Sequence, residues 1–175
     1  GLIYAWTVLS GPISVEYPDW SKASLSLTFT LVMVFFCLGS LLAGILIKKI
    51  SAANFIRIAG VLLAFGLFLA SRITGLTGLY LSFGVVCGFA VGLVYSPVLS
   101  TVGKWFPDKP GLISGMMLMG FGISSLLVGK LFQACTPDTV GAWRSSYTVI
   151  GLVAGAVIFA CSFLIAPPPA DYTVE

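Results

Sequence analysis

The stretch that decides the fold is residues 84–122, GVVCGFAVGLVYSPVLSTVGKWFPDKPGLISGMMLMGFG. Two long apolar runs flank a short hydrophilic segment, residues 104–110, of sequence KWFPDKP. An apolar helix of about 20 residues crosses the hydrocarbon core of a bilayer, because each residue adds about 1.5 Å. The stretch therefore predicts two membrane-spanning helices joined by a tight hairpin at the membrane surface.

The composition of the whole chain points to the same medium. Of its 175 residues, 58% are hydrophobic and only 9% are charged, whereas a soluble domain carries about 25% charged residues. The apolar runs are continuous rather than alternating, so helices and not barrel strands satisfy the backbone in lipid. We therefore predict an all-α integral membrane protein whose first partner is the lipid bilayer.

Six apolar runs follow one another, separated by loops that contain proline, glycine or charged residues. A helix over the first run would rise only about 24 Å, so we expect that span to begin upstream. The predicted spans, which form a six-helix bundle over residues 1–166 before a polar loop at 167–175, are 1–16, 25–47, 54–72, 79–103, 111–133 and 146–166.

The basic residues predict the orientation of this bundle. Loops on the cytoplasmic side of membrane proteins carry an excess of Lys and Arg. The densest basic cluster, Lys48 and Lys49, follows the second span, and the hairpin after the fourth span adds Lys104 and Lys109. We therefore expect both ends of this segment to lie in the cytoplasm.

Glycines recur at helical spacing on both sides of the hairpin. Small residues let helix backbones approach closely, and in lipid such packing largely drives helix association. We predict that the following glycines pack against neighbouring helices: Gly84, Gly88 and Gly92 in the fourth span, and Gly111, Gly115, Gly122 and Gly129 in the fifth.

Several kinds of chemistry lack the residues they need. The chain has no histidine, its four cysteines show no ligand spacing, and no phosphate-binding or dinucleotide-binding motif occurs. Away from the ends of the predicted spans there is no Asp, Glu, Lys or Arg, so we expect no buried ion pair and no proton relay. The net charge of +3 forms no basic patch. We predict no enzyme activity, no cofactor, no metal and no nucleic-acid partner.

Four aromatic residues are the candidates for a binding site. Tyr4 and Trp6 lie in the first span, Tyr95 in the fourth and Phe121 in the fifth, all away from the predicted span ends. One interpretation is a cavity lined by rings and hydroxyls. The alternative is that these side chains pack between helices and touch no ligand.

The order of spans and loops resembles the N-terminal half of a twelve-helix major facilitator superfamily transporter. That superfamily carries a glycine-containing, charged motif after its second span. Gly44 and Lys49 match this motif, whereas Lys48 stands where an acidic residue is usual. The resemblance implies that a second, C-terminal six-helix half completes the protein.

The hairpin carries a more specific resemblance, to the oxalate/formate antiporter family and its monocarboxylate-type members. The matching residues are Lys104, Trp105, Phe106, Pro107, Asp108 and Lys109. This resemblance implies a secondary transporter of the plasma membrane that moves small organic anions, such as monocarboxylates or oxalate and formate, by alternating access.

What the resemblance implies for the site is a role for the aromatic residues in orienting the substrate. Tyr4 and Tyr95 match tyrosines of that family's central site. Phe121 stands where the oxalate transporter has a tyrosine, which favours a less polar carboxylate than oxalate. The cationic groups of that site belong to the C-terminal half. The alternative from another functional class is a non-transporting membrane sensor or assembly scaffold on the same fold.

Overall fold

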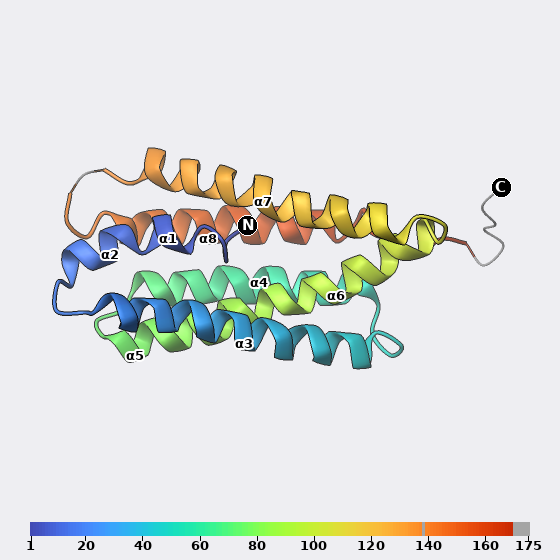
Figure 1. The fold of residues 1–175 in the computed structure, drawn as a ribbon, viewed down its shortest axis with the longest axis horizontal. Helices are drawn as coiled ribbons and strands as arrows, with labels where there is room; N and C mark the ends of the chain where they lie inside the picture. Colours follow the sequence, from blue (N-terminus) through green and yellow to red (C-terminus); the bar gives the residue numbers. More distant parts are fainter. Residues whose placement is uncertain (138, 170–175) are drawn as a thin grey trace.

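A computed structural model describes residues 1–137 and 139–169, and within these ranges the chain is all-helical (Figure 1). The last six residues of the predicted polar loop, 170–175, lie outside the described residues. The elements are α1 (Trp6–Leu9), α2 (Gly11–Glu16), α3 (Lys22–Leu46), α4 (Ala52–Ser71), α5 (Leu76–Leu79), η1 (Tyr80–Cys87), α6 (Gly88–Trp105), α7 (Pro110–Cys135) and α8 (Trp143–Cys161).

Five helices in the described residues are long and apolar enough to cross a membrane. Four of them are α3, α4, α7 and α8, and the fifth is the continuous unit formed by α5, η1 and α6 over Leu76–Trp105. The η1 segment is π-helical, a wider winding that the hydropathy pattern does not reveal. The prediction of an all-helical membrane fold is confirmed.

The first apolar run differs from a regular span. It forms only the two short helices α1 and α2, which are interrupted at Ser10. Pro12 has no amide hydrogen and cannot complete the helical hydrogen bond to Val8. We call residues 1–17 segment 1. Segment 1 lies beside the end of the bundle at which α8 begins (Figure 1).

Close backbone contacts fasten the long helices in pairs. A Cβ built on Gly92 of α6 would overlap the carbonyl oxygen of Phe36 in α3, and one on Gly88 would lie 2.7 Å from the carbonyl oxygen of Val32. On the other side of the bundle, a Cβ on Gly155 of α8 would lie 2.8 Å from the carbonyl oxygen of Gly60. Only glycine allows α6 to approach α3, and α8 to approach α4, this closely.

Helix α7 lies along one edge of the bundle (Figure 1), and few of its residues are buried. Apart from the nearby backbone of α7 and the residues next to each glycine in the chain, no described atom comes within 4 Å of a Cβ built on Gly111, Gly115 or Gly122, whereas a Cβ on Gly129 would make ordinary contact with Val8 of segment 1. The predicted packing role of Gly111, Gly115 and Gly122 therefore fails within this part of the chain, because α7 turns these glycines away from its neighbours.

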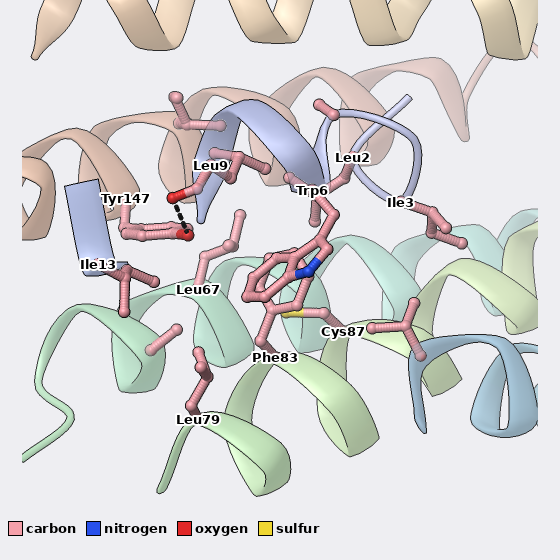
Figure 2. Packing of buried hydrophobic residues seen from close by; sticks show 14 of the residues in the cluster. Leu2, Ile3, Trp6, Leu9, Ile13, Leu67, Leu79, Phe83, Cys87 and Tyr147 are labelled. Atoms are coloured by element: carbon pink, nitrogen blue, oxygen red, sulfur yellow. Dashed lines mark hydrogen bonds between the residues drawn. The ribbon is translucent and has the colours of Figure 1, made fainter. Parts of the chain in front are cut away.

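The core lies where segment 1 meets α8 and η1. Figure 2 shows Trp6 and Leu9 of α1 facing Tyr147 of α8 and Phe83 of η1. The ring centroids of Trp6 and Phe83 are 4.7 Å apart. This packing gives segment 1 one fixed face, and the opposite face carries Tyr4, which is 55% exposed.

Candidate functional site

The structure brings three of the four candidate rings into one cluster. Phe121 of α7 meets Tyr4 of segment 1 edge to face at a centroid distance of 6.2 Å, and it meets Tyr95 of α6 at 5.7 Å. Phe36 of α3 joins them, with its centroid 5.4 Å from that of Tyr95. We call Tyr4, Phe36, Tyr95 and Phe121 the aromatic cluster. It joins four elements: segment 1, α3, α6 and α7.

The close approach of α3 and α6 explains why Phe36 belongs to this cluster. Gly92 lets the backbone of α6 rest on the carbonyl oxygen of Phe36. Tyr95 follows Gly92 by three residues, nearly one helical turn, so its ring lies on the same side of α6. Sequence reasoning missed Phe36. The glycine spacing signals a close helix contact, but it does not say which helix makes it.

A cavity of about 250 Å³ adjoins the cluster. Tyr95 and Phe121 line it together with Met117, Val91 and other apolar residues, and Ser124 contributes a hydroxyl. Tyr4 contacts Phe121 but is not part of this lining. The cavity is therefore an apolar space, with Tyr95 and Ser124 supplying polar groups.

Trp6 does not join the cluster. Its side chain is only 6% exposed, its ring packs on Phe83, and its indole N–H donates to the carbonyl oxygen of Leu25 at 3.2 Å. Tyr4 and Trp6 are two residues apart and point to opposite sides of segment 1. The interpretation of Trp6 as a substrate-binding residue is corrected: it is a core residue that fastens segment 1 to α3.

The polar groups of the cluster are available to a ligand. Among the described residues, neither the hydroxyl of Tyr4 nor that of Tyr95 has a hydrogen-bond partner within the protein. No charged side chain lines the cavity. Within the described ranges, no group of three or more Cys, Asp or Glu could hold a metal ion. The arrangement can orient a small molecule by hydrogen bonds and ring contacts, and any compensating charge must come from outside this cavity.

A polar network occupies the end of the bundle opposite the hairpin. Arg144, near the start of α8, pairs with Glu16 at the end of α2 at 2.8 Å. The indole N–H of Trp143 donates to the other carboxylate oxygen of Glu16, and the Arg144 guanidinium donates to the Tyr17 hydroxyl. The pair lies at the ends of the predicted spans and is partly buried, so it is separate from the expectation of no ion pair inside the spans.

The hairpin motif lies at the other end of the bundle, where α6 passes into α7 (Figure 1). Lys104 and Trp105 close α6, and Trp105 donates its indole N–H to the carbonyl oxygen of Ala166 at 3.0 Å. Phe106, Pro107, Asp108 and Lys109 form the turn before Pro110 starts α7.

The basic loop after α3 contributes no residue to the aromatic cluster. Lys48 and Lys49 follow the end of α3 at Leu46. Gly44 lies inside α3, where an added Cβ would meet Ser96 of α6 at 3.4 Å. These residues and the hairpin are therefore separate from the cavity that Tyr95 and Phe121 line.

The family model of the Major Facilitator Superfamily matches residues 2–175. The chain belongs to this superfamily. The match covers nearly the whole chain and agrees with the helical bundle described above. The family consists of multi-pass membrane transporters, and the protein is a member of a transporter family rather than an enzyme.

Relatives with assigned names include transporters of small acids. The chain is 33% identical over 129 residues to monocarboxylate transporter 13 of Rattus norvegicus, and this alignment covers 74% of the chain and 29% of that protein. It is 27% identical over 169 residues to the oxalate:formate antiporter of Oxalobacter formigenes, covering 96% of this chain and 39% of that protein.

A bacterial relative, the uncharacterised MFS-type transporter YhjX of Escherichia coli (strain K12), is 30% identical over 154 residues. That alignment covers 88% of this chain and 38% of the relative. The chain thus spans less than half the length of these relatives, as the N-terminal half of a major facilitator fold does.

Proposed function

We propose that this chain is the N-terminal half of a secondary transporter for small organic anions of the monocarboxylate or oxalate/formate type. The observation that carries the proposal is the aromatic cluster, in which the hydroxyls of Tyr4 and Tyr95 lack partners within the described chain and lie beside Phe121. Phenolic hydroxyls are good donors to a carboxylate, and rings suit the apolar part of a small acid.

The absence of charge in this cavity supports a divided site. An anion bound in a low-dielectric cavity needs a compensating cation, because desolvation of an unpaired carboxylate is costly. Since no charged residue lines the described cavity, we propose that the C-terminal half supplies an Arg or Lys. The two halves would then rock about a shared site near the bilayer midplane, in the manner of alternating access.

We also propose an orientation for this half. Lys48, Lys49, Lys104 and Lys109 lie in loops that we assign to the cytoplasm, with both ends of the described segment on that side of the plasma membrane. Glu16 and Arg144 then lie at the opposite, outer end.

Uptake by proteoliposomes that contain the full-length protein tests the function. Labelled formate, oxalate, lactate and pyruvate are offered in turn, with and without an internal carboxylate for exchange. We expect uptake or exchange of at least one of them. No uptake of any of the four would contradict the proposed substrate class and favour a sensor or scaffold on the same fold.

Tyr95→Phe tests the site within this experiment. The variant keeps the ring contacts with Phe36 and Phe121 and removes only the hydroxyl, so we expect a loss of about tenfold in transport efficiency, since a hydrogen bond to a charged group contributes about 1.5–3 kcal/mol. Tyr80→Phe is the control, because the Tyr80 hydroxyl donates to the Ser24 carbonyl away from the cavity. Unchanged kinetics in Tyr95→Phe would remove that hydroxyl from the site.

A further inference from the structure

Segment 1 contains a point at which its helix is mechanically weak. Helix α1 ends at Leu9 and α2 begins at Gly11, followed by Pro12. The backbone angles of Ser10 remain helical (φ −79°, ψ −16°), so the two helices still follow one another. Pro12 lacks an amide hydrogen, and Gly11 has no side chain to stiffen the backbone. Segment 1 can therefore bend at this interruption with little loss of hydrogen bonding.

The part of segment 1 beyond the interruption is fastened firmly. Glu16 at the end of α2 accepts from Arg144 at 2.8 Å and from the indole of Trp143, and Tyr17 accepts from Arg144 at 2.8 Å. Ile13 on the same part is fully buried. These contacts tie α2 to α8, so α2 moves with the bundle.

The part before the interruption carries Tyr4 and is held differently. Its buried face packs in the core, and Trp6 donates to the carbonyl of Leu25. At the interruption itself, the hydroxyl of Tyr147 donates to the carbonyl oxygen of Leu9 at 3.0 Å, as the dashed line in Figure 2 shows. This bond joins the last residue of α1 directly to α8.

Tyr147 is well placed to act as a rigid support. Its side chain is completely buried. Its ring meets Trp143 edge to face at 5.2 Å, Phe132 at 5.7 Å and Phe83 at 6.3 Å. A ring enclosed on three sides keeps its hydroxyl in one place, so the Leu9 carbonyl is held in a defined position relative to α8.

We propose that Tyr147 is a positioning residue for substrate binding: its hydroxyl, bound to the Leu9 carbonyl at the interruption of segment 1, holds the part that carries Tyr4 against the bundle. This inference rests on the proposed function of the aromatic cluster. Without the bond, α1 keeps its core packing and the Trp6–Leu25 hydrogen bond, but its Leu9 end moves more freely about the interruption. Ordering Tyr4 against Phe121 then costs more conformational entropy each time a substrate binds.

The substitution Tyr147→Phe tests this directly in the full-length protein, because it removes one hydroxyl and keeps the ring. We expect the KM for the transported carboxylate to rise about fivefold, from the loss of one hydrogen bond, with kcat unchanged. The control is Tyr80→Phe, which also removes a tyrosine-to-carbonyl bond, that of Tyr80 to Ser24 at 2.9 Å. That bond joins η1 to α3, so the control should leave KM unchanged.

A second measurement does not depend on transport. Spin labels are attached to Thr7→Cys on α1 and Ile45→Cys on α3 in a background without native cysteines, and the distribution of distances between them is measured by pulsed electron paramagnetic resonance. A second pair of labels is attached to Val15→Cys on α2 and Ile45→Cys on α3. Thr7, Val15 and Ile45 are all exposed in this half. We expect Tyr147→Phe to broaden the distribution of the first pair and not of the second.

The outcomes separate the inference from the function on which it rests. The inference is overturned if Tyr147→Phe has the same KM and the same label distances as the unsubstituted protein. The proposed function is not affected by that result. An equal rise in KM in Tyr80→Phe also overturns the inference, because the loss of any tyrosine-to-carbonyl hydrogen bond would then raise KM as much as the loss of the bond at Leu9. If the unsubstituted protein transports no carboxylate, the proposed function fails, and the label pairs alone decide whether Tyr147 holds α1.

Discussion

The guanidinium of Arg144 lies 2.8 Å from a carboxylate oxygen of Glu16, although 128 positions separate the two residues in the chain. The same guanidinium donates to the Tyr17 hydroxyl and to the backbone carbonyls of Ser71 and Ile73. One side chain thus joins segment 1, the end of α4 and α8. Segment 1 and the start of α8 meet at the end of the bundle that lies opposite the hairpin (Figure 1).

Arg144→Gln should lower the free energy of unfolding of the full-length protein by about 2 kcal/mol, because it leaves partly buried acceptors without their donor. Thermal unfolding of the purified protein in detergent measures this. The matched control at the same end is Arg72→Gln, since the Arg72 guanidinium lies over the Phe68 ring at 5.4 Å, a contact that contributes about 0.5–1 kcal/mol at an exposed site. Equal losses in both variants would contradict a special role for Arg144.

Gly92→Ala should destabilise the bundle by about 1–3 kcal/mol, because the added methyl group overlaps the Phe36 carbonyl and forces α3 and α6 apart. Gly103→Ala on the same helix is the control, since no atom outside its own backbone surroundings lies within 4 Å of a Cβ built there. Thermal unfolding and the monodisperse fraction after detergent extraction measure both. A Gly92→Ala protein as stable as the control would show that the two helices do not pack this closely.

Hydropathy alone predicts most of the fold. The long apolar runs became the five long helices because a bilayer demands a helix wherever the chain crosses it. The π-helical η1 was not predicted, because average hydropathy does not report how the backbone hydrogen bonds are arranged. Glycine spacing indicated where close packing is possible. It could not indicate that Gly92 meets α3 while Gly122 meets no described helix, since that depends on the tertiary arrangement.

The candidate site was predicted in part. Tyr4, Tyr95 and Phe121 come together in the structure, and Phe36 was missed because its membership depends on the pairing of α3 with α6. The sequence itself argued against placing Trp6 in the site together with Tyr4. Residues two positions apart on a helix face different sides, so Tyr4 and Trp6 could not both have faced one cavity.

Thr28→Val should leave the protein as stable as before or raise the free energy of unfolding by about 1 kcal/mol. The Thr28 hydroxyl is fully buried and has no hydrogen-bond partner among the described residues, and an apolar group of the same shape removes that desolvation cost. Thr148→Val is the control, because its hydroxyl contacts Ser71 at 3.0 Å and the Arg144 carbonyl at 3.2 Å. We expect Thr148→Val to be destabilised, and a clear loss in Thr28→Val would reveal a partner for Thr28 outside the described chain.

Phe121→Tyr should shift the preference of the proposed transporter toward a more polar acid. The ring of Phe121 touches both Tyr4 and Tyr95, so a hydroxyl on it would add a third donor to the aromatic cluster. A hydrogen bond to a charged group contributes about 1.5–3 kcal/mol, and we expect the ratio of oxalate to lactate uptake to rise about tenfold. Competition between the two labelled acids in proteoliposomes measures the ratio. Phe106→Tyr, on the exposed hairpin, is the matched control and should leave it unchanged. An active Phe121→Tyr protein with an unaltered ratio would mean that this ring does not contact the substrate.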